Sequence, residues 1–399
     1  MSTLKTTNIQ NASSATTNIA LDTSGNVTVG NNVTVGGGIT ASSGTVVMSS
    51  PYTMRNKIIN GAMVIDQRNA GASVTVSAND TSYYPADRAM VRKNSSATIT
   101  TQQSTTVPTG FKNSALVTVT AGSAVGAGNY ALIGQNIEGF NVSDLGFGTA
   151  NAATITVSFW ARSSATGTYN FYFANNADSR SYVTTFTINA ANTFEYKTIS
   201  ITGDTSGTWT TDNTSGLKVG VTLGAGTTFQ TTANTWTTGT YLGTSTATNT
   251  FLTAANTFYI TGLQVERGTV ATPFEYRNYQ QELAMCQRYY WRMTRTSTST
   301  SDVTGAFAMG QTWTNTFQVY IPFPVIMRTG PTADFSAAGT FQFHIGGVTN
   351  TAVSGLTINQ SLVDGARIQC SWTYSGTNGL AGQLAAYNAT AYLGFNSEL

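Results

Sequence analysis

Charged side chains are scarce in this 399-residue chain: Asp, Glu, Lys and Arg make up 9% of it, whereas about 25% is usual in globular domains. The 19 basic and 17 acidic residues give a net charge of +2, and no run of lysines or arginines occurs. Binding to nucleic acid depends on a basic surface that neutralises phosphates. We therefore expect no nucleic-acid partner.

Histidine and cysteine are almost absent as well. One histidine, His344, and two cysteines, Cys286 and Cys370, are too few for a histidine-rich metal site or a disulfide framework. We expect both cysteines to be buried as small apolar residues. No calcium-binding loop motif, signal peptide or membrane-spanning apolar run occurs. Neither a metal, a cofactor nor membrane insertion is therefore expected.

The same scarcity argues against an enzyme. His344 lies between Phe343 and Ile345 in an alternating stretch, as a strand residue would, and no Gly-x-Ser-x-Gly nucleophile motif occurs. Enzymes that cleave glycans place two carboxylates in one cleft, whereas the acidic residues of this chain are scattered. We expect a non-enzymatic protein without catalytic residues.

Serine, threonine, asparagine and glycine take the place of the charges, and branched and aromatic residues are plentiful. The small polar residues compete with helices for backbone hydrogen bonds, whereas branched and aromatic residues favour strands. Between about residues 95 and 265, apolar and polar residues alternate in short stretches, such as Ile155, Val157 and Phe159, then Tyr169, Phe171 and Phe173, then Leu217, Val219, Val221 and Leu223. This pattern predicts an all-β fold with a two-sheet sandwich.

The N-terminal segment, residues 1–53, has no pattern of a buried core. It contains a six-residue repeat, Asn26-Val-Thr-Val-Gly-Asn followed by Asn32-Val-Thr-Val-Gly-Gly. Two interpretations stay open. The segment is either a disordered leader of low complexity or a β-rich shaft in which three chains place Val27 and Val29 toward a common axis.

The next region, residues 54–272, begins with an Asn60-Gly61 tight-turn signal between two expected strands. It ends in a strand whose apolar residues change from even-numbered positions, such as Phe258, to odd-numbered positions, such as Leu263. A phase shift of one residue at a glycine predicts a β-bulge at Gly262.

Residues 273–295 are expected to contain one short connecting helix. Thr272 as N-cap, Pro273 at the first position and Glu275 as the capping-box partner would begin it. Apolar residues then recur at spacings of three and four: Tyr276, Tyr279, Leu283, Cys286, Tyr290 and Met293. Two interpretations stay open: a helix that closes the end of the sandwich, or a seam between the three chains of a homotrimer.

For residues 296–399, the sequence predicts a small C-terminal β domain, which we name the tip domain. Apolar and polar residues alternate in its expected strands at 317–324, 341–345 and 367–374. Pro322 places the first of these at an edge or an end of a sheet. A domain this small buries a limited core, so association with copies of itself would stabilise it.

Recognition of a sugar needs flat aromatic faces beside neutral hydrogen-bonding groups, and aromatic residues in polar loops provide both. The candidate carbohydrate-binding residues are Trp209, Trp236 and Tyr241 in the first domain, and Trp313, Trp372, Tyr374 and Tyr387 in the tip domain. Trp372 and Tyr374 share the parity of neighbouring apolar residues, so a core position is the competing interpretation for them.

Several motifs occur in a fixed order: Asn56-Lys-Ile-Ile-Asn-Gly, Asp66-Gln-Arg, Tyr84-Pro-Ala-Asp-Arg, Gly262-Leu-Gln-Val-Glu-Arg-Gly, Thr272-Pro-Phe-Glu-Tyr-Arg, Cys286-Gln-Arg-Tyr-Tyr and Pro324-Val-Ile-Met-Arg-Thr-Gly-Pro-Thr. This series, over about residues 54–335, resembles the receptor-binding tail fibre proteins of tailed bacteriophages, and the N-terminal leader is similar to those of marine-phage fibres. Where the family carries tryptophan after Asp-Arg, this chain has Ala89-Met90. Asp87 and Glu266, which adjoin arginines within the motifs, are expected to form structural ion pairs.

The resemblance implies a homotrimer on the exterior of a virion. Residues 54–272 would form a jelly-roll domain like a carbohydrate-binding module, followed by the connecting helix and the tip domain. Residues 1–53 would dock to a virion tail or capsid protein. The expected function is attachment to a host cell-surface glycan, a polysaccharide or lipopolysaccharide. Two alternatives stay open: a structural head or tail fibre without a receptor role, and a tailspike that depolymerises the glycan.

Overall fold

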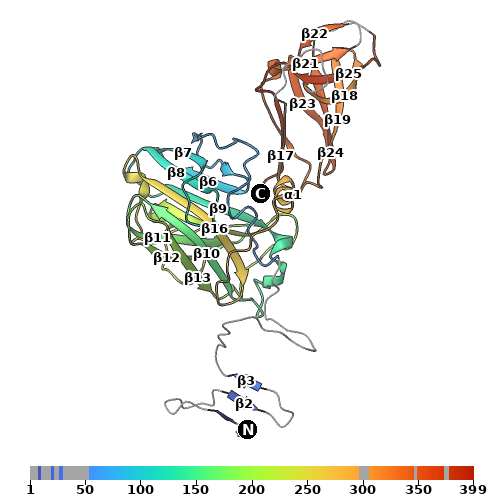
Figure 1. Cartoon of the computed structure of the whole chain (residues 1–399). Helices are drawn as coiled ribbons and strands as arrows, with labels where there is room; N and C mark the ends of the chain where they lie inside the picture. The colour runs from blue at the N-terminus through green and yellow to red at the C-terminus, as the bar shows by residue number, and fades with distance from the viewer. Residues whose placement is uncertain are drawn as a thin grey trace, which may run out of the picture. The chain divides into compact units, whose positions relative to one another are not determined.

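The computed structural model describes residues 54–295, 305–345, 348–372 (348–352 by backbone only) and 377–399, together with three short strands near the N-terminus. These strands, β1 (Asn8–Ile9), β2 (Ile19–Leu21) and β3 (Val27–Val29), pair antiparallel in the order β1-β2-β3 (Figure 1). They belong to one unit, Met1–Ser49, and the rest of the chain forms a second unit, Ser50–Leu399. The strand predicted at Val27 is thus confirmed, and the second repeat lies outside the described residues.

The second unit begins with a β-sandwich of two antiparallel sheets that face each other (Figure 1). The six-stranded sheet has the order β13-β10-β16-β8-β7-β4, with β4 (Val74–Val76), β7 (Thr98–Ser104), β8 (Ser114–Ala121), β10 (Ile155–Ser163), β13 (Glu195–Ile201) and β16 (Thr257–Arg267). The seven-stranded sheet has the order β15-β12-β11-β14-β9-β6-β5, with β5 (Tyr83–Ala86), β6 (Ala89–Asn94), β9 (Tyr130–Glu138), β11 (Gly167–Ala174), β12 (Arg180–Ile188), β14 (Ser215–Ala225) and β15 (Trp236–Thr238). The predicted all-β class and two-sheet sandwich are both confirmed.

The core of the sandwich is built from the alternating residues that predicted it. Phe159 of β10 and Phe171 of β11, one from each sheet, stack with ring centroids 5.3 Å apart. In β16, Gly262 adopts a φ of +63°, and the register against β10 shifts by one extra residue at this point. The shift lets Phe258 and Leu263, which have opposite parity, enter the same core. The predicted bulge is confirmed.

The segment 54–66 does not form the two strands predicted on either side of Asn60-Gly61. The turn itself is present, because the amide of Met63 donates to the carbonyl of Asn60 over 2.8 Å. The side-chain oxygen of Asn60 accepts from the amides of Val64 and Ile65, and its side-chain nitrogen donates to two buried carbonyls. The side chain of Asn60 thus supplies hydrogen bonds that the backbone groups of this segment would make with a neighbouring strand in a sheet.

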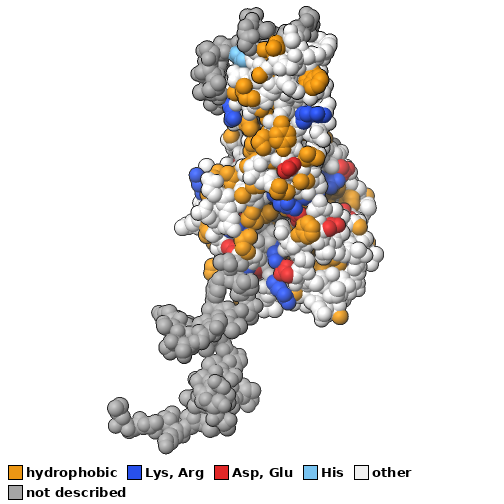
Figure 2. Space-filling view, turned by 90° about the vertical axis from the view of Figure 1, so that its right-hand side faces the viewer, with side chains coloured by type: hydrophobic (Ala, Val, Ile, Leu, Met, Phe, Trp, Pro, Cys, Tyr) orange, Lys and Arg blue, Asp and Glu red, His pale blue; other side chains and the backbone are white. Residues whose placement is uncertain are grey.

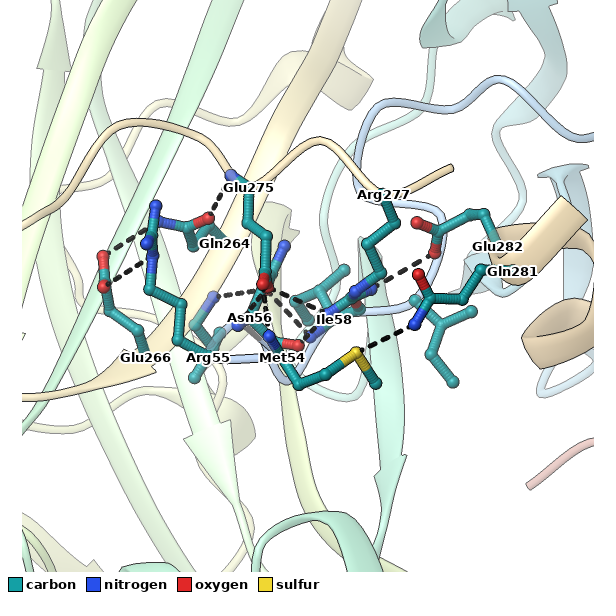
Figure 3. Close-up of polar contacts among 12 residues, drawn as sticks. Met54, Arg55, Asn56, Ile58, Gln264, Glu266, Glu275, Arg277, Gln281 and Glu282 are labelled. Atoms are coloured by element: carbon teal, nitrogen blue, oxygen red, sulfur yellow. Dashed lines mark hydrogen bonds and ion pairs between the residues drawn. The ribbon is translucent and has the colours of Figure 1, made fainter. Parts of the chain in front are cut away.

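A polar clamp from the residues after β16 holds the start of this segment (Figure 3). The carboxylate of Glu275 accepts hydrogen bonds from the amides of Met54 and, over 2.9 Å, of Asn56. Arg277 donates to the carbonyl of Ile58 over 2.9 Å. Glu275, which was predicted to complete a capping box, therefore binds a segment that lies 219 positions earlier in the chain.

The connecting helix is shorter and begins later than predicted: α1 spans Tyr279–Gln287. Its N-cap is Asn278. The side-chain oxygen of Asn278 accepts a hydrogen bond from the backbone amide of Gln280 over 3.0 Å. Thr272, the predicted cap, instead donates to Glu266 of β16 over 2.7 Å. The predicted helix start is wrong because Thr272 and Glu275 both have partners that local sequence does not show.

The six residues of the predicted trimer seam do not form one helical stripe. Tyr279, Leu283 and Cys286 lie in α1, Tyr276 precedes it, and Tyr290 and Met293 lie in the strand β17 (Tyr290–Thr294). Cys286 and Tyr290 are fully buried within the chain, whereas Tyr276 and Tyr279 are exposed. A continuous seam over residues 276–293 is therefore wrong, because the chain changes from helix to strand inside it. The homotrimer itself stays a prediction.

The region predicted as the tip domain carries two more antiparallel sheets. Its seven-stranded sheet has the order β22-β21-β25-β18-β19-β24-β23, with β18 (Ala306–Trp313), β19 (Thr316–Pro322), β21 (Phe341–Ile345), β22 (Val348–Ala352), β23 (Gly355–Ser361), β24 (Gly365–Ser371) and β25 (Ala381–Ala386). The three-stranded sheet has the order β17-β26-β20, with β20 (Thr332–Phe335) and β26 (Tyr392–Asn396). Pro322 ends β19, as predicted for a strand end. Cys286 and Cys370 are free and buried, as predicted.

The C-terminal residues lie beside α1 (Figure 1). Leu399 packs against a cluster that contains Cys286 and Tyr289. Glu398 pairs with Arg68 at 3.1 Å and also with Arg88. Buried charges need partners of this kind, since an unpaired one would cost several kcal/mol. Among the described residues, no helix is long and apolar enough to span a membrane.

Candidate functional site

The outer face of the seven-stranded sheet of the sandwich carries a row of residues in register: Met90, Gly134, Gly220, Tyr172 and Val183. The two glycines adjoin each other, so neither contributes a side chain of its own to the middle of the row. A Cβ atom on Gly220 would lie 2.6 Å from the carbonyl oxygen of Ile133 and 2.9 Å from the ring of Tyr172. The ring of Tyr172 therefore lies over Gly220, and the lack of a side chain at Gly220 makes room for this ring.

A groove with a volume of 220 Å³ lies over this face. Its floor includes Met90, Leu132 and Tyr172, which belong with Tyr130 to an apolar cluster separate from the main core. The other lining residues are Asp80, Arg92, Asn136, Asp178, Lys218, Phe229, Thr240 and Leu242. The groove thus combines aromatic rings, neutral polar groups and a few charges.

Tyr172 contributes a hydroxyl group to the groove. Its side chain is 3% exposed, and within the described part of the chain its hydroxyl makes no hydrogen bond. Burial, together with the negative charge of Asp178, raises the pKa of Tyr172, so the hydroxyl stays protonated at neutral pH. The hydroxyl oxygen is not one of the fully buried side-chain atoms that lack a partner, so a molecule in the groove can reach it. A ligand in the groove can supply the missing partner.

The charges at the rim of the groove are paired with one another. Lys218 binds Asp178 at 2.7 Å, and Arg92 lies 3.7 Å from Asp80. Asp80 also accepts a hydrogen bond from the hydroxyl of Tyr130. Since each cation faces one carboxylate, the groove carries no net charge.

Trp209 and Trp236, which sequence reasoning placed in two separate loops, meet at one edge of the sandwich. Their rings lie edge to face at 5.4 Å, and Phe147 lies 4.9 and 5.9 Å from them. Their indole N–H groups donate to the carbonyls of Ser206 and Thr202. Phe147 and Trp209 also line a second cavity, of 270 Å³. With both N–H groups already bonded, this cluster offers a ligand ring surface only.

The other predicted residues do not join one site. Tyr241 is half-buried against the apolar cluster beside the groove. Trp372 is 4% exposed in the tip core, which favours the competing interpretation of a core residue. Trp313 and Tyr387 are exposed, the first at the end of β18 and the second after β25. Tyr374 lies outside the described residues.

Sequence reasoning missed Tyr172 and the glycine pair. Tyr172 lies between Phe171 and Phe173 and has the opposite parity to these core residues. A signal was therefore present, since a large aromatic residue on the polar parity of a strand marks the outer face of the sheet. No such signal exists for Gly134 and Gly220, because only the pairing of β9 with β14 brings them together.

Asp87 and Glu266 form structural ion pairs, as predicted, but with arginines other than their neighbours. Asp87 lies 3.5 Å from Arg68, and Glu266 lies 3.6 Å from Arg55. Both acids are buried, and burial raises the pKa of Asp87 to about 7. In the described ranges, no three His, Cys, Asp or Glu side chains are grouped so that they could hold a metal ion.

No protein-family model and no curated protein matches the sequence. Among solved structures, the chain is similar to the enzymatically active domain of bacteriophage CBA120 tailspike protein 4, with 11% identity and a TM-score of 0.27 over 54% of this chain and 22% of that one. It is also similar to a family 11 carbohydrate-binding module of a Clostridium thermocellum cellulase (13%, TM-score 0.26, 51% of this chain and 99% of that one). A third is the xylan-binding CBM22-1 domain of Paenibacillus barcinonensis Xyn10C (11%, TM-score 0.21, 51% and 99%). Likenesses this low assign no ligand to this chain.

Proposed function

We propose that this chain is a non-enzymatic fibre protein of a bacteriophage, located on the exterior of the virion, that attaches the virion to a host cell-surface glycan. The observation that carries the proposal is the hydroxyl of Tyr172, which has no partner among the described residues, in a groove lined by aromatic and other apolar side chains, two neutral polar groups and two ion pairs. The ordered motifs that resemble those of phage fibres supply the virion context.

The chemistry of the groove suits a sugar. A sugar presents apolar C–H faces and many hydroxyl groups, so it needs flat rings beside neutral hydrogen-bonding partners. Phe229 is partly exposed and can present its ring, Tyr172 contributes its hydroxyl, and Asn136 supplies an amide, whereas the rings of Tyr130 and Tyr172 are buried. Ligand sites in proteins are typically concave and largely apolar, with a few polar groups that converge on the ligand. A phosphorylated ligand would need unpaired cations, and both cations at the rim are paired.

The proposal includes a homotrimer, held on the virion by residues 1–53 through a tail or capsid protein. Three weak sites on one fibre can raise apparent affinity by about 10²–10⁴ without any new contact. Neutral contacts suit the surface of this chain: on the face drawn in Figure 2, white atoms, which are neither charged nor hydrophobic side chains, predominate. Such contacts are also less screened by salt than ion pairs.

The variant Tyr172→Phe tests the groove. The full-length protein is applied to an array of bacterial surface polysaccharides and lipopolysaccharides, and Tyr169→Phe serves as the control, because Tyr169 lies on the core side of the same strand. We expect Tyr172→Phe to weaken binding about tenfold, as the loss of one hydrogen bond does, and Tyr169→Phe to leave it unchanged. Equal binding by all three proteins would remove the groove as the site. No binding by the wild type would remove the proposed function.

The same array separates attachment from the alternatives. A depolymerase would release oligosaccharides from the bound polysaccharide, and we expect none in the supernatant. A structural fibre would bind no glycan, and antibodies against residues 305–399 would leave adsorption to host cells unchanged.

A further inference from the structure

The tip domain presents a second surface with the chemistry of sugar recognition, on the outer face of its seven-stranded sheet. Phe317 and Val319 of β19 point into the tip core, so the alternate residues of β19 point outward. We name as the outer tip face the outward residues Met309, Gln311 and Trp313 of β18, Gln318 and Tyr320 of β19, and Gln369 of β24. Met309, Trp313 and Tyr320 are 65%, 48% and 52% exposed.

The outer tip face is ordered in rows. Gln311, Gln318 and Gln369 are direct cross-strand neighbours on β18, β19 and β24. Tyr320 lies in the row on one side of these glutamines, and Trp313 lies in the row on the other side. Residues two positions apart on a strand are about 6.8 Å apart, so two such steps separate the aromatic side chains by about 14 Å along the strands. The three amides lie between them.

The outer tip face carries almost no charge. Among the outward residues of its described strands, only Arg367 and His344 are ionisable besides Tyr320, and none is a carboxylate. The guanidinium of Arg367 already donates to the side chain of Asn359. Burial lowers the pKa of His344, so this side chain is neutral at pH 7. Arg367 is thus the one charged side chain among the described residues of this face, beside Tyr320 in the register. The side-chain oxygen of Gln369 already accepts from Gln318 and Asn359, so Gln369 offers a ligand its N–H groups, whereas Gln311 and Gln318 offer groups that donate and accept.

We propose that the outer tip face is a second glycan-binding platform. Trp313 and Tyr320 stack on two sugars of one uncharged oligosaccharide segment, and the amides of Gln311, Gln318 and Gln369 bind the hydroxyl groups between them. The proposal rests on the proposed function for the class of ligand, but it uses none of the groove residues. An interface between copies of the chain would gather its apolar residues at the centre, whereas here a row of amides separates the aromatic side chains.

Binding of the full-length chain to an array of neutral bacterial polysaccharides and oligosaccharides tests the platform. One variant combines Trp313→Ala with Tyr320→Ala, and a second, Gln318→Leu, keeps the side-chain size but removes the amide. Tyr196→Ala, which removes an exposed tyrosine from the six-stranded sheet of the sandwich, is the control. We expect the double variant to weaken binding about tenfold or more and Gln318→Leu to weaken it about fivefold, with no change for the control.

The outcomes separate the two proposals. Unchanged binding by the double variant overturns the platform, and if Tyr172→Phe still loses binding on the same array, the groove and the proposed function stand. If the double variant changes the mass of the assembly in light scattering, the outer tip face is an interface between copies, which also overturns the platform. If the wild type binds no saccharide on the array, both proposals fail.

Discussion

Tyr169 and Tyr172 lie on the same strand, β11, but face opposite sides of its sheet, and among the described residues only Tyr169 has partners for its hydroxyl group. The hydroxyl of Tyr169 bonds to the side chain of Ser163 and to the carbonyl of Ala165, both at 2.8 Å. An odd spacing along a strand places two side chains on opposite faces. One tyrosine is therefore part of the folded core, and the other presents its hydroxyl to the groove.

This contrast predicts different stabilities for the two phenylalanine variants. Tyr169→Phe should lower the free energy of unfolding by about 1–2 kcal/mol, because it removes two buried hydrogen bonds. Tyr172→Phe should change it by less than about 0.5 kcal/mol, since no internal bond is lost. Urea titration followed by tryptophan fluorescence measures both values. Similar losses for the two variants would mean that the hydroxyl of Tyr172 is bonded within the chain.

Because of the bulge in β16, we predict that any side chain at Gly262 lowers the stability of the fold. This residue has a φ of +63°, and a Cβ atom on it would lie 2.7 Å from the ring of Phe111. We expect Gly262→Ala to lower the free energy of unfolding by about 1–3 kcal/mol. Gly128→Ala is the matched control, because a Cβ atom there meets nothing within 4 Å. A stable Gly262→Ala variant would show that the register of β16 can slip without the bulge.

We predict that truncation of the Asn60 side chain strongly lowers the free energy of unfolding. Its buried side chain makes four hydrogen bonds to the backbone of the turn and its surroundings. Asn60→Ala leaves these groups without partners, and we expect a loss of about 3 kcal/mol or more in the free energy of unfolding. Asn141→Ala, at an exposed position, should change it by less than about 0.5 kcal/mol. Equal midpoints in a thermal melt would rule out the role assigned to Asn60.

We predict that the stability of the protein depends on pH through the titration of Asp87. Burial raises its pKa in the folded protein to about 7, compared with about 3.9 in an unfolded chain. The folded state therefore binds this proton more tightly. The resulting stabilisation is complete below about pH 4 and is lost as the pH rises to about 7.

The comparison of the wild type with Asp87→Asn isolates this effect. Relative to the variant, the free energy of unfolding of the wild type should fall by up to about 1.4 kcal/mol per pH unit between pH 4 and pH 7. Other titrating groups are present in both proteins and cancel in the difference. Urea unfolding at half-unit steps of pH gives the slope. A difference that stays constant across this window would show that Asp87 keeps an ordinary pKa.

Local patterns predicted the sandwich well. In strands such as β10 and β11, every second residue faces the core, as Val157 and Phe159 or Phe171 and Phe173 do, and this period is enough to recognise a strand. The bulge at Gly262 was also visible, because a change of parity at a glycine is a local event. The helix start failed for the opposite reason. Thr272 and Glu275 have the spacing of a capping box, but their partners, Glu266 and the segment at Asn56, come from the tertiary structure.

By itself, the sequence determined that the chain is a β protein with few charges, with apolar faces that pair into sheets. Only the tertiary structure decided which aromatic residues are buried and which can meet a ligand. Trp372 entered a core, Trp209 and Trp236 packed against each other, and Tyr172 opened onto a groove. The physical reason is strand register, which places residues from distant parts of the chain side by side and which no local pattern encodes.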